Sequence, residues 1–260
     1  MSAPVVPSGD RGFTLGDGLF ETVLAEGGEL VRPDAHLDRL TAGCASLGLP
    51  APDRALALNL MRQALGDSGL DEARAAVRLT LTAGSGGRGL DRPVELRPRL
   101  VATAAAAPRP TTPARLVTAA VRRNDQSPAA RLKTLSYLDN VLARAEAQAA
   151  GADEALMLNT RGELACAAAA NLFWIHGGRL FTPALSCGAL AGTARARVLT
   201  IAAGLGLEVC EARSTPDALE AAEAVFLTNA LVGLRPVGEV DGRQFGPHRL
   251  AEQLARTLEA

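Results

Sequence analysis

Lysine is nearly absent from this chain. Of the 27 basic residues, 26 are arginine, and the single lysine is Lys133 in the stretch "RLKTLSYLDN". Lysine is normally among the commonest residues. An arginine supplies positive charge equally well, but only a lysine amine readily loses its proton and acts as a nucleophile. Lys133 is therefore the first candidate for chemistry.

Several other features that would indicate particular partners are also missing. The net charge is −1 and aromatic residues make up only 3% of the chain, so neither a basic surface nor stacking platforms for nucleic acid are expected. No apolar run reaches the ~18 residues that span a bilayer. The first ten residues, "MSAPVVPSGD", lack the charged and apolar regions of a secretory signal. We expect a cytoplasmic protein with no nucleic-acid or membrane partner.

The metal-binding residue types are few and scattered. The four cysteines are Cys44, Cys166, Cys187 and Cys210, and the three histidines are His36, His176 and His248. No two cysteines form a C-x-x-C pair, and no two histidines are four residues apart. This spacing favours neither a zinc site nor a disulfide framework, so we predict no metal.

The first half of the chain alternates strand and helix patterns. "LFETVLAEGGELV" (19–31) predicts a β-hairpin that turns at Gly27 and Gly28. Apolar spacing predicts helices over 33–49 and 53–65, and β-rich runs predict strands over 74–84 and 94–107. "PRPTTP" (108–113) continues neither a helix nor a central strand, so we interpret it as a linker between two domains.

The second half contains many short strands and few helices. Leu135, Leu138, Leu142 and Ala145 predict one helical face in a helix over 135–151. A further helix is expected over 195–207. Strands are predicted at 115–123, 154–159, 163–168, 171–176, 179–183, 208–213, 223–230 and 235–240. This order predicts an α+β, or mixed α/β, protein with a domain over 1–107, the linker over 108–113 and a larger domain over 114–260.

Lys133 and two glycine-containing stretches carry the chemical signals. A lysine just before a helix and near Arg131 lies in positive potential, which favours the neutral, nucleophilic amine, although a solvated lysine is an equal alternative. Gly192 and Thr193 stand where a helix begins, so backbone N–H groups there could hold a phosphate. The end of the predicted strand 223–230 is a second such candidate. "TAGSGGRG" (82–89) lacks the context of a dinucleotide-binding motif.

These stretches together resemble the class IV aminotransferases, which use pyridoxal phosphate. The matching segments cover nearly the whole chain: "DRGFTLGDGLFET" (10–22), "HLDRL" (36–40), "GSGGRG" (84–89), "KTLSYLDNVLARAEAQAAGADEALMLN" (133–159), "NLFW" (171–174), "AGTAR" (191–195) and "TNALVGLRPV" (228–237). The resemblance implies a two-domain fold like that of D-amino-acid aminotransferase, with a small α/β domain and a larger, pseudo-barrel domain that binds the cofactor.

The resemblance also assigns site residues. It implies that Lys133 binds the cofactor aldehyde covalently and that Arg39 grips the cofactor phosphate, although Arg39 on its own pattern reads as a solvated helix residue. The residues expected to complete the phosphate site are Gly192, Thr193, Ala194, Asn229 and Ala230. It further implies a homodimer with its site between the domains and a small amino compound as substrate.

Two stretches favour one branch of the family. "GSGGRG" and "TNALVGLRPV" resemble those of aminodeoxychorismate lyases, which release 4-aminobenzoate and pyruvate in folate biosynthesis. "KTLSYLDN" and "GDGLFET" occur in transaminases as well. A branched-chain or D-amino-acid aminotransferase is therefore the alternative to the lyase.

One position departs from the family pattern. Class IV members have a glutamate five residues before the asparagine of "NLF", where it protonates the pyridine nitrogen, whereas this chain has Cys166. A thiol of ordinary pKa is a poor partner for a pyridinium. Glu163 is three residues earlier, so it points to the opposite strand face unless a bulge intervenes. A slower lyase, a chemistry with less carbanion stabilisation, and a catalytically silent or cofactor-free homologue all stay open.

Overall fold

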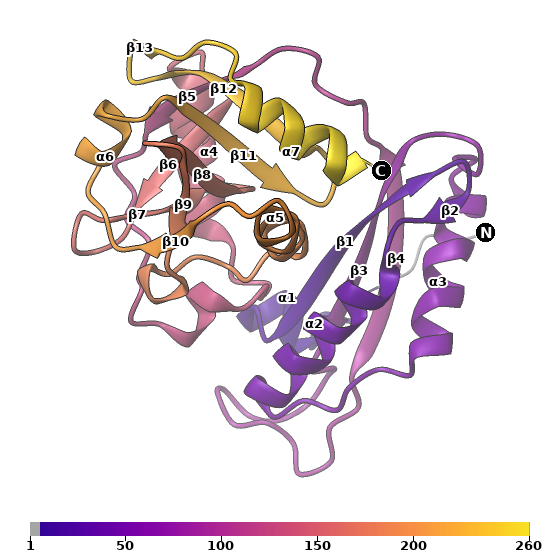
Figure 1. The fold of residues 1–260 in the computed structure, drawn as a ribbon. Helices are drawn as coiled ribbons and strands as arrows, with labels where there is room; N and C mark the ends of the chain where they lie inside the picture. The colour runs from indigo at the N-terminus through magenta and orange to yellow at the C-terminus, as the bar shows by residue number, and fades with distance from the viewer. Residues whose placement is uncertain (1–5, 260) are drawn as a thin grey trace. The chain divides into compact units, whose positions relative to one another are not determined.

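The chain divides into two units, each with its own sheet. The computed structural model describes residues 6–259 (Figure 1), so Met1–Val5, the start of the stretch on which we predict no secretory signal, lie outside the described residues. The first unit extends to Pro108 and includes Leu132–Ser136, and the second comprises Arg109–Arg131 and the chain from Tyr137. Lys133 thus groups with the first unit, although it follows the predicted linker in sequence.

The first unit is a four-stranded antiparallel sheet accompanied by helices. Its elements are α1 (Arg11–Leu15), β1 (Gly18–Glu26), β2 (Glu29–Leu30), α2 (Pro33–Leu47), α3 (Arg54–Asp67), β3 (Ala75–Thr82) and β4 (Arg99–Ala106), and the strand order is β2-β1-β3-β4. The predicted hairpin over 19–31 is confirmed, with Gly27 and Gly28 both at positive φ in its turn. Such φ values are ones that glycine adopts without strain.

Local sequence explains the two longer helices of this unit. Pro33 stands in the first turn of α2, where its missing N–H costs nothing, and Gly48 ends the helix in a left-handed conformation. The side-chain oxygen of Asp53 accepts from the N–H of Leu56 and begins α3. Both predicted helices are confirmed. Each buries one apolar face: Leu37, Leu40 and Cys44 from α2, and Ala57, Met61 and Leu65 from α3.

The second unit is a nine-stranded mixed sheet with helices. Its elements are β5 (Ala114–Thr118), a 3-10 turn (Pro128–Arg131), α4 (Leu138–Ala149), β6 (Glu154–Leu158), β7 (Leu164–Ala167), β8 (Asn171–His176), β9 (Arg179–Pro183), a 3-10 turn (Leu185–Cys187), α5 (Thr193–Gly204), β10 (Val209–Ala212), α6 (Asp217–Glu220), β11 (Ala224–Asn229), β12 (Gly233–Val240), β13 (Arg243–Gln244) and α7 (Arg249–Glu259). The strand order is β10-β9-β8-β11-β12-β5-β6-β7, with β13 beside β12. The mixed α/β fold class is confirmed.

The central strands of this sheet are buried on both faces. Along β8, Leu172 and Trp174 belong to one apolar cluster, whereas Phe173 and Ile175 belong to another that includes residues of α5 and α7. Successive strand residues point to opposite faces, so each face needs its own covering layer. Figure 1 shows α5 and α7 beside this sheet. Among the described residues, no helix has the length and apolar character to cross a bilayer.

The helix α4 differs from its prediction in two ways. It begins at Leu138 rather than at residue 135, and it buries Ala143 and Ala147 against β6. The side chains of Leu138 and Leu142, which belong to the predicted apolar face, are 67% and 47% exposed. An apolar stripe shows which residues share a helix face, but small alanines allow the closer approach to a sheet. The sequence predicts neither the helices α1, α6 and α7 nor the short strand β13.

Candidate active site

The backbone around Lys133 is attached to strand β1. The N–H of Phe20 donates to the carbonyl oxygen of Lys133 at 2.9 Å, and the N–H of Leu135 donates to the carbonyl of Gly18 at 3.0 Å. Because α4 begins only at Leu138, Lys133 lies outside the first turn of that helix. The helix therefore begins three residues later than predicted, and pairing with strand β1 fixes the backbone at Lys133.

The Lys133 amine lies against an aromatic ring. Its Nζ is 4.2 Å from the centroid of the Phe20 ring, and the guanidinium carbon of Arg78 is 3.6 Å from the same centroid. Phe20 itself is only 5% exposed, so the ring is a fixed surface. Cations are attracted to aromatic faces at such distances. The sequence predicts neither neighbour, because Phe20 and Arg78 lie far from Lys133 along the chain.

Arg39 belongs to a buried cluster of ionisable side chains on the same unit. Its Nε and Nη2 donate to the two carboxylate oxygens of Glu21 at 2.8 and 2.6 Å, and Nδ1 of His36 lies 2.8 Å from Oε2. Burial alone would raise the pKa of Glu21, but the hydrogen bonds from Arg39 and His36 outweigh it, and the pKa lies below its usual range. Glu21 is therefore an anion that holds the Arg39 guanidinium in one orientation.

The environment of Arg39 decides between two interpretations of its sequence pattern. The side chain of Arg39 is 18% exposed and that of Glu21 is 1% exposed. A solvated surface arginine does not fit this burial and bidentate pairing. The role of Arg39 as a phosphate ligand stays a prediction.

In the second unit, a tight turn follows Cys166. The N–H of Ala167 donates to the carbonyl of Ala170, which closes the turn between β7 and β8. The side-chain amide of Asn140, on α4, donates to the carbonyl of Ala168 at 2.8 Å, and that of Asn229 donates to the carbonyl of Ala169 at 3.1 Å. Two asparagines from separate elements therefore hold the turn that positions Cys166.

The predicted phosphate residues lie at one edge of this sheet. Asn171, the first residue of β8, pairs with Thr228 of β11, and its side-chain amide donates to the carbonyl of Leu190 at 2.8 Å. These contacts join the end of β11, where Asn229 and Ala230 lie, to the loop before α5. The structure thus brings Gly192, Thr193 and Ala194 to the same edge as Asn229 and Ala230.

This edge has the features of an anion site. Gly192 is the N-cap of α5 and supplies no side-chain cap, and backbone N–H groups in the first turn of a helix have no intrahelical acceptor. The hydroxyl of Thr228 is fully buried and has no hydrogen-bond partner among the described residues. The side chain of Asn229 instead holds its own loop by accepting from the N–H groups of Leu231 and Val232.

Cys166 has no carboxylate substitute on its own strand. The register between β6 and β7 shifts between the pairs Met157–Cys166 and Leu158–Leu164, so the bulge that could redirect Glu163 is present. The carboxylate of Glu163, however, accepts from Asn159 at 2.7 Å and pairs with Arg213 at 2.9 Å. Glu163 is therefore bound to other partners.

The cysteines are not arranged for metal binding or cross-linking. Cys44, Cys166 and Cys187 are buried, Cys210 is partly exposed, and all four are free thiols. Within residues 6–259, no group of three histidine, cysteine or acidic side chains is placed to hold a metal ion.

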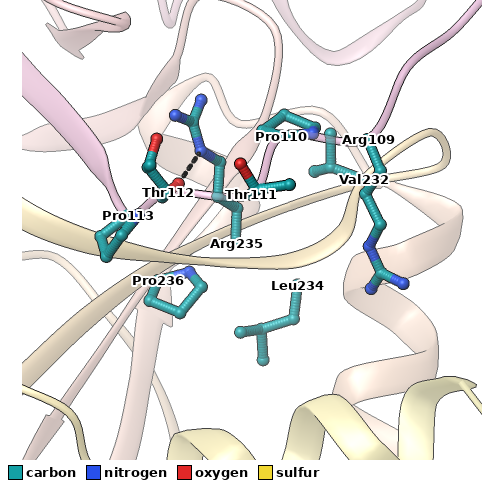
Figure 2. A pocket seen from close by; sticks show the side chains of 9 residues that line it. All are labelled: Arg109, Pro110, Thr111, Thr112, Pro113, Val232, Leu234, Arg235 and Pro236. Atoms are coloured by element: carbon teal, nitrogen blue, oxygen red, sulfur yellow. Dashed lines mark hydrogen bonds between the residues drawn. The ribbon is translucent and has the colours of Figure 1, made fainter.

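A separate pocket lies beside the predicted linker. It has a volume of about 200 Å³ and is formed by the segment 109–113 and the start of β12 (Figure 2). Two of the lining residues are joined by a hydrogen bond: Nε of Arg235 donates to the carbonyl of Thr112 at 3.0 Å. Nη2 of Arg235 pairs with Asp153 at 3.1 Å. None of the predicted site residues lines this pocket, so it is distinct from the phosphate edge.

Comparison with known proteins assigns the family. The family described as amino-transferase class IV matches residues 18–240. The chain belongs to this family. It is 32% identical over 253 residues to a putative branched-chain-amino-acid aminotransferase of Methanocaldococcus jannaschii, covering 94% of this chain and 85% of the relative. It is 30% identical over 240 residues to an aminodeoxychorismate lyase of Vibrio harveyi, covering 90% and 87%.

A solved structure gives the same result for the fold. The crystal structure of 4-amino-4-deoxychorismate lyase from Pseudomonas aeruginosa matches with a TM-score of 0.89 and 32% identity, covering 99% of this chain and 96% of that chain. This class IV protein is therefore a pyridoxal-phosphate-dependent enzyme, either a lyase or an aminotransferase. The α5 N-terminus and the Thr228 hydroxyl, which has no hydrogen-bond partner among the described residues, fit the phosphate of that cofactor.

Proposed function

We propose that this enzyme is a lyase that converts 4-amino-4-deoxychorismate into 4-aminobenzoate and pyruvate in folate biosynthesis. The observation that carries the proposal is the loop "GSGGRG" (84–89), which resembles that of the lyases. Gly84 and Gly87 both have φ +81, and a Cβ on either would lie 2.0 Å from a backbone oxygen, that of Arg97 or Asp91. Glycine is thus required at both positions. The backbone conformation of the loop, and not merely a glycine-rich composition, accounts for these two residues of the motif.

In this proposal Lys133 is the catalytic base and acid. When bound, pyridoxal phosphate would supply electron withdrawal from the carbon that bears the substrate amine. The Lys133 amine removes the proton from that carbon, the neighbouring carbon–oxygen bond breaks, and the departing enolpyruvate takes up a proton to become pyruvate. The Phe20 ring keeps the amine in place between these steps.

Other residues hold the cofactor. Arg39, oriented by Glu21, and the backbone N–H groups around Thr193, Ala194 and Ala230 would bind its phosphate. The helix dipole of α5 favours an anion at the same place. Cys166 takes the position beside the cofactor ring.

An aminotransferase is the second candidate. The 32% identity to the M. jannaschii relative, over nearly the full chain, is as high as that to the P. aeruginosa lyase. In that case an amino group passes to a keto acid, with a branched-chain or D-amino acid as donor.

Products separate the two candidates. The purified protein is reconstituted with pyridoxal phosphate and divided between two assays. Aminodeoxychorismate should yield equal amounts of 4-aminobenzoate and pyruvate, whereas amino acids with 2-oxoglutarate should yield no new keto acid. Turnover in the second assay alone would make the protein an aminotransferase, and turnover in neither would support the silent homologue.

We also propose that the enzyme is a cytoplasmic homodimer. Three apolar side chains of α4, Leu138, Val141 and Leu142, are between 47% and 67% exposed and lie on neighbouring turns. Such a stripe is a suitable surface for a second copy of the chain. Light scattering should give twice the mass of 26.8 kDa, and L142E should shift it toward the monomer.

A further inference from the structure

We propose that the ring nitrogen of pyridoxal phosphate stays unprotonated in this protein, because the groups at that end of the cofactor are the buried Cys166 thiol and the buried guanidinium of Arg123, which pairs with no carboxylate of the described residues. This inference rests on the proposed cofactor site, in which the family resemblance aligns Cys166 with the residue beside the ring nitrogen. The inference concerns the charge of the side chains that this chain places beside the ring nitrogen.

The surroundings of Cys166 are apolar. The side chain is 5% exposed, pairs across the sheet with Met157, and belongs to a cluster that includes Ala143 and Ala147 of α4. Burial raises the pKa of the Cys166 thiol, the charge of Arg123 opposes that rise, and Glu154 adds to it. The thiol therefore keeps its proton at neutral pH and offers no negative charge to a pyridinium.

A buried cation, Arg123, acts on Cys166 and pairs with neutral groups. Arg123 is 6% exposed and donates to three neutral acceptors: the carbonyls of Gly188 and Ala130 and the side-chain oxygen of Asn140. Among the described residues, no carboxylate is within ion-pair distance of it. Asn140 in turn holds the carbonyl of Ala168, in the turn directly after Cys166. A protonated ring would add a second positive charge to this region, which is unfavourable where water is excluded.

One carboxylate, that of Glu154, contributes to the raised pKa of the Cys166 thiol. Glu154, the first residue of β6, is 7% exposed, and burial raises its pKa. Its carboxylate accepts from the N–H of Ala155 at 2.9 Å and pairs with Arg144 at 3.4 Å. Glu154 is three residues before Met157, the partner of Cys166, so strand alternation directs it to the opposite face. Hydrogen bonds from the N–H groups of Ala155 and Ala169 and the ion pair with Arg144 occupy the Glu154 carboxylate instead.

The direct test is nuclear magnetic resonance of the holoenzyme loaded with pyridoxal phosphate labelled with ¹⁵N in the ring. Wild type and the size-matched C166S should both show the chemical shift of a neutral pyridine throughout the neutral pH range, and C166E should show that of a pyridinium. A pyridinium signal in wild type would overturn the inference, and its loss in E154Q would assign the proton to Glu154. A neutral ring in a folded C166E holoenzyme would also overturn it, because residue 166 would not control the charge.

A second measurement uses wild type only and so does not depend on the folding of C166E. Its affinity for pyridoxal phosphate is compared with that for the analogue in which C–H replaces the ring nitrogen. A neutral contact predicts a loss of less than about tenfold, whereas loss of a charged hydrogen bond would exceed about tenfold and contradict the inference. Borohydride treatment is run in parallel. A trapped adduct on Lys133 with a protonated ring overturns only this inference, whereas no adduct overturns the proposed function as well.

Discussion

Asn171 and Gly192 are in such close contact that position 192 has room only for glycine. A Cβ built on Gly192 would lie 2.1 Å from Oδ1 of Asn171, whose amide nitrogen donates to the carbonyl of Leu190. Asn171 also pairs with Thr228, so this contact joins the end of β11 to the beginning of α5. The proposed phosphate site therefore depends on a glycine at position 192.

We expect G192A to weaken cofactor binding. The added methyl group must push Asn171 or the first turn of α5 aside, and overpacking of this kind costs about 1–3 kcal/mol, or about 5–150-fold in affinity. Titration of the apoprotein with pyridoxal phosphate, followed by absorbance, measures the effect. The control is G204A at the other end of α5, where a Cβ meets nothing within 4 Å. Equal affinities of G192A and wild type would rule out this edge as the phosphate site.

K133R should abolish covalent capture of the cofactor. Arginine keeps the positive charge but does not form an imine with an aldehyde, so borohydride should leave no cofactor on the peptide that contains residue 133. Peptide mapping by mass spectrometry is the measurement. The double variant K133R/R131K places a lysine two residues away on the exposed Arg131 position and should not restore capture. Restored capture there would mean that any nearby lysine suffices.

The stability of the first unit should depend on pH through the ionisation of Glu21. Its pKa is lowered in the folded protein, so its contribution is full above the unfolded value of about 4.3 and is lost as the pH falls through the lower folded value. E21Q should lower the free energy of unfolding at neutral pH by about 3 kcal/mol, because it leaves Arg39 and His36 without their anion. It should also reduce the loss of stability between about pH 7 and about pH 3.5.

Urea unfolding at both pH values measures this dependence. The matched control is E29Q, since Glu29 is exposed on the neighbouring strand β2. An acid dependence in E21Q as steep as that in wild type would show that Glu21 does not carry it.

R11K should loosen the loop 84–91. Arg11 is 5% exposed, pairs with Asp17 at 2.9 Å, and its Nη atoms donate to the carbonyls of Leu90 and Asp91 at 3.0 and 3.1 Å. A lysine keeps the charge but has no planar fork to reach these acceptors together. Amide hydrogen exchange in residues 86–91 should accelerate at least about tenfold, which corresponds to about 1.4 kcal/mol of local opening free energy.

The control for this loop is R97K. Arg97 pairs with Glu95 at the surface, where its side chain is 80% exposed, and surface pairs of this kind contribute about 0–1 kcal/mol. Unchanged exchange of residues 86–91 in R11K would show that the glycine backbone alone maintains the loop.

Local patterns predicted most elements of the fold because their causes are local. The hairpin over 19–31 follows from Gly27 and Gly28, and the helix α2 follows from Pro33 and the spacing of its leucines. The error on α4 has an equally clear reason. The stripe of Leu138 and Leu142 shows which residues share a face, but burial depends on what packs there, and β6 packs on the alanines instead.

The site could be predicted only in part, for a related reason. Lys133 stands out as the only lysine of the chain, and the glycines before α5 mark the beginning of a helix. Nothing along the chain shows that Phe20 lies under the Lys133 amine or that Arg39 is paired with Glu21. Those pairs join residues that are distant in sequence: backbone pairing determines the first, and the packing of α2 against β1 determines the second.

The amino-acid sequence by itself determined which groups are available: one nucleophilic amine, glycines where the backbone must turn or approach closely, and Cys166 in place of a carboxylate. Only the tertiary structure decided what surrounds each group, because the burial of Cys166, the hydrogen bonds of Arg123 to neutral acceptors and the hydrogen bond from Asn140 to Ala168 all arise from packing. Burial removes water and with it the screening of charge. The same side chain therefore has a different chemistry inside the fold than in the solvated, unfolded chain.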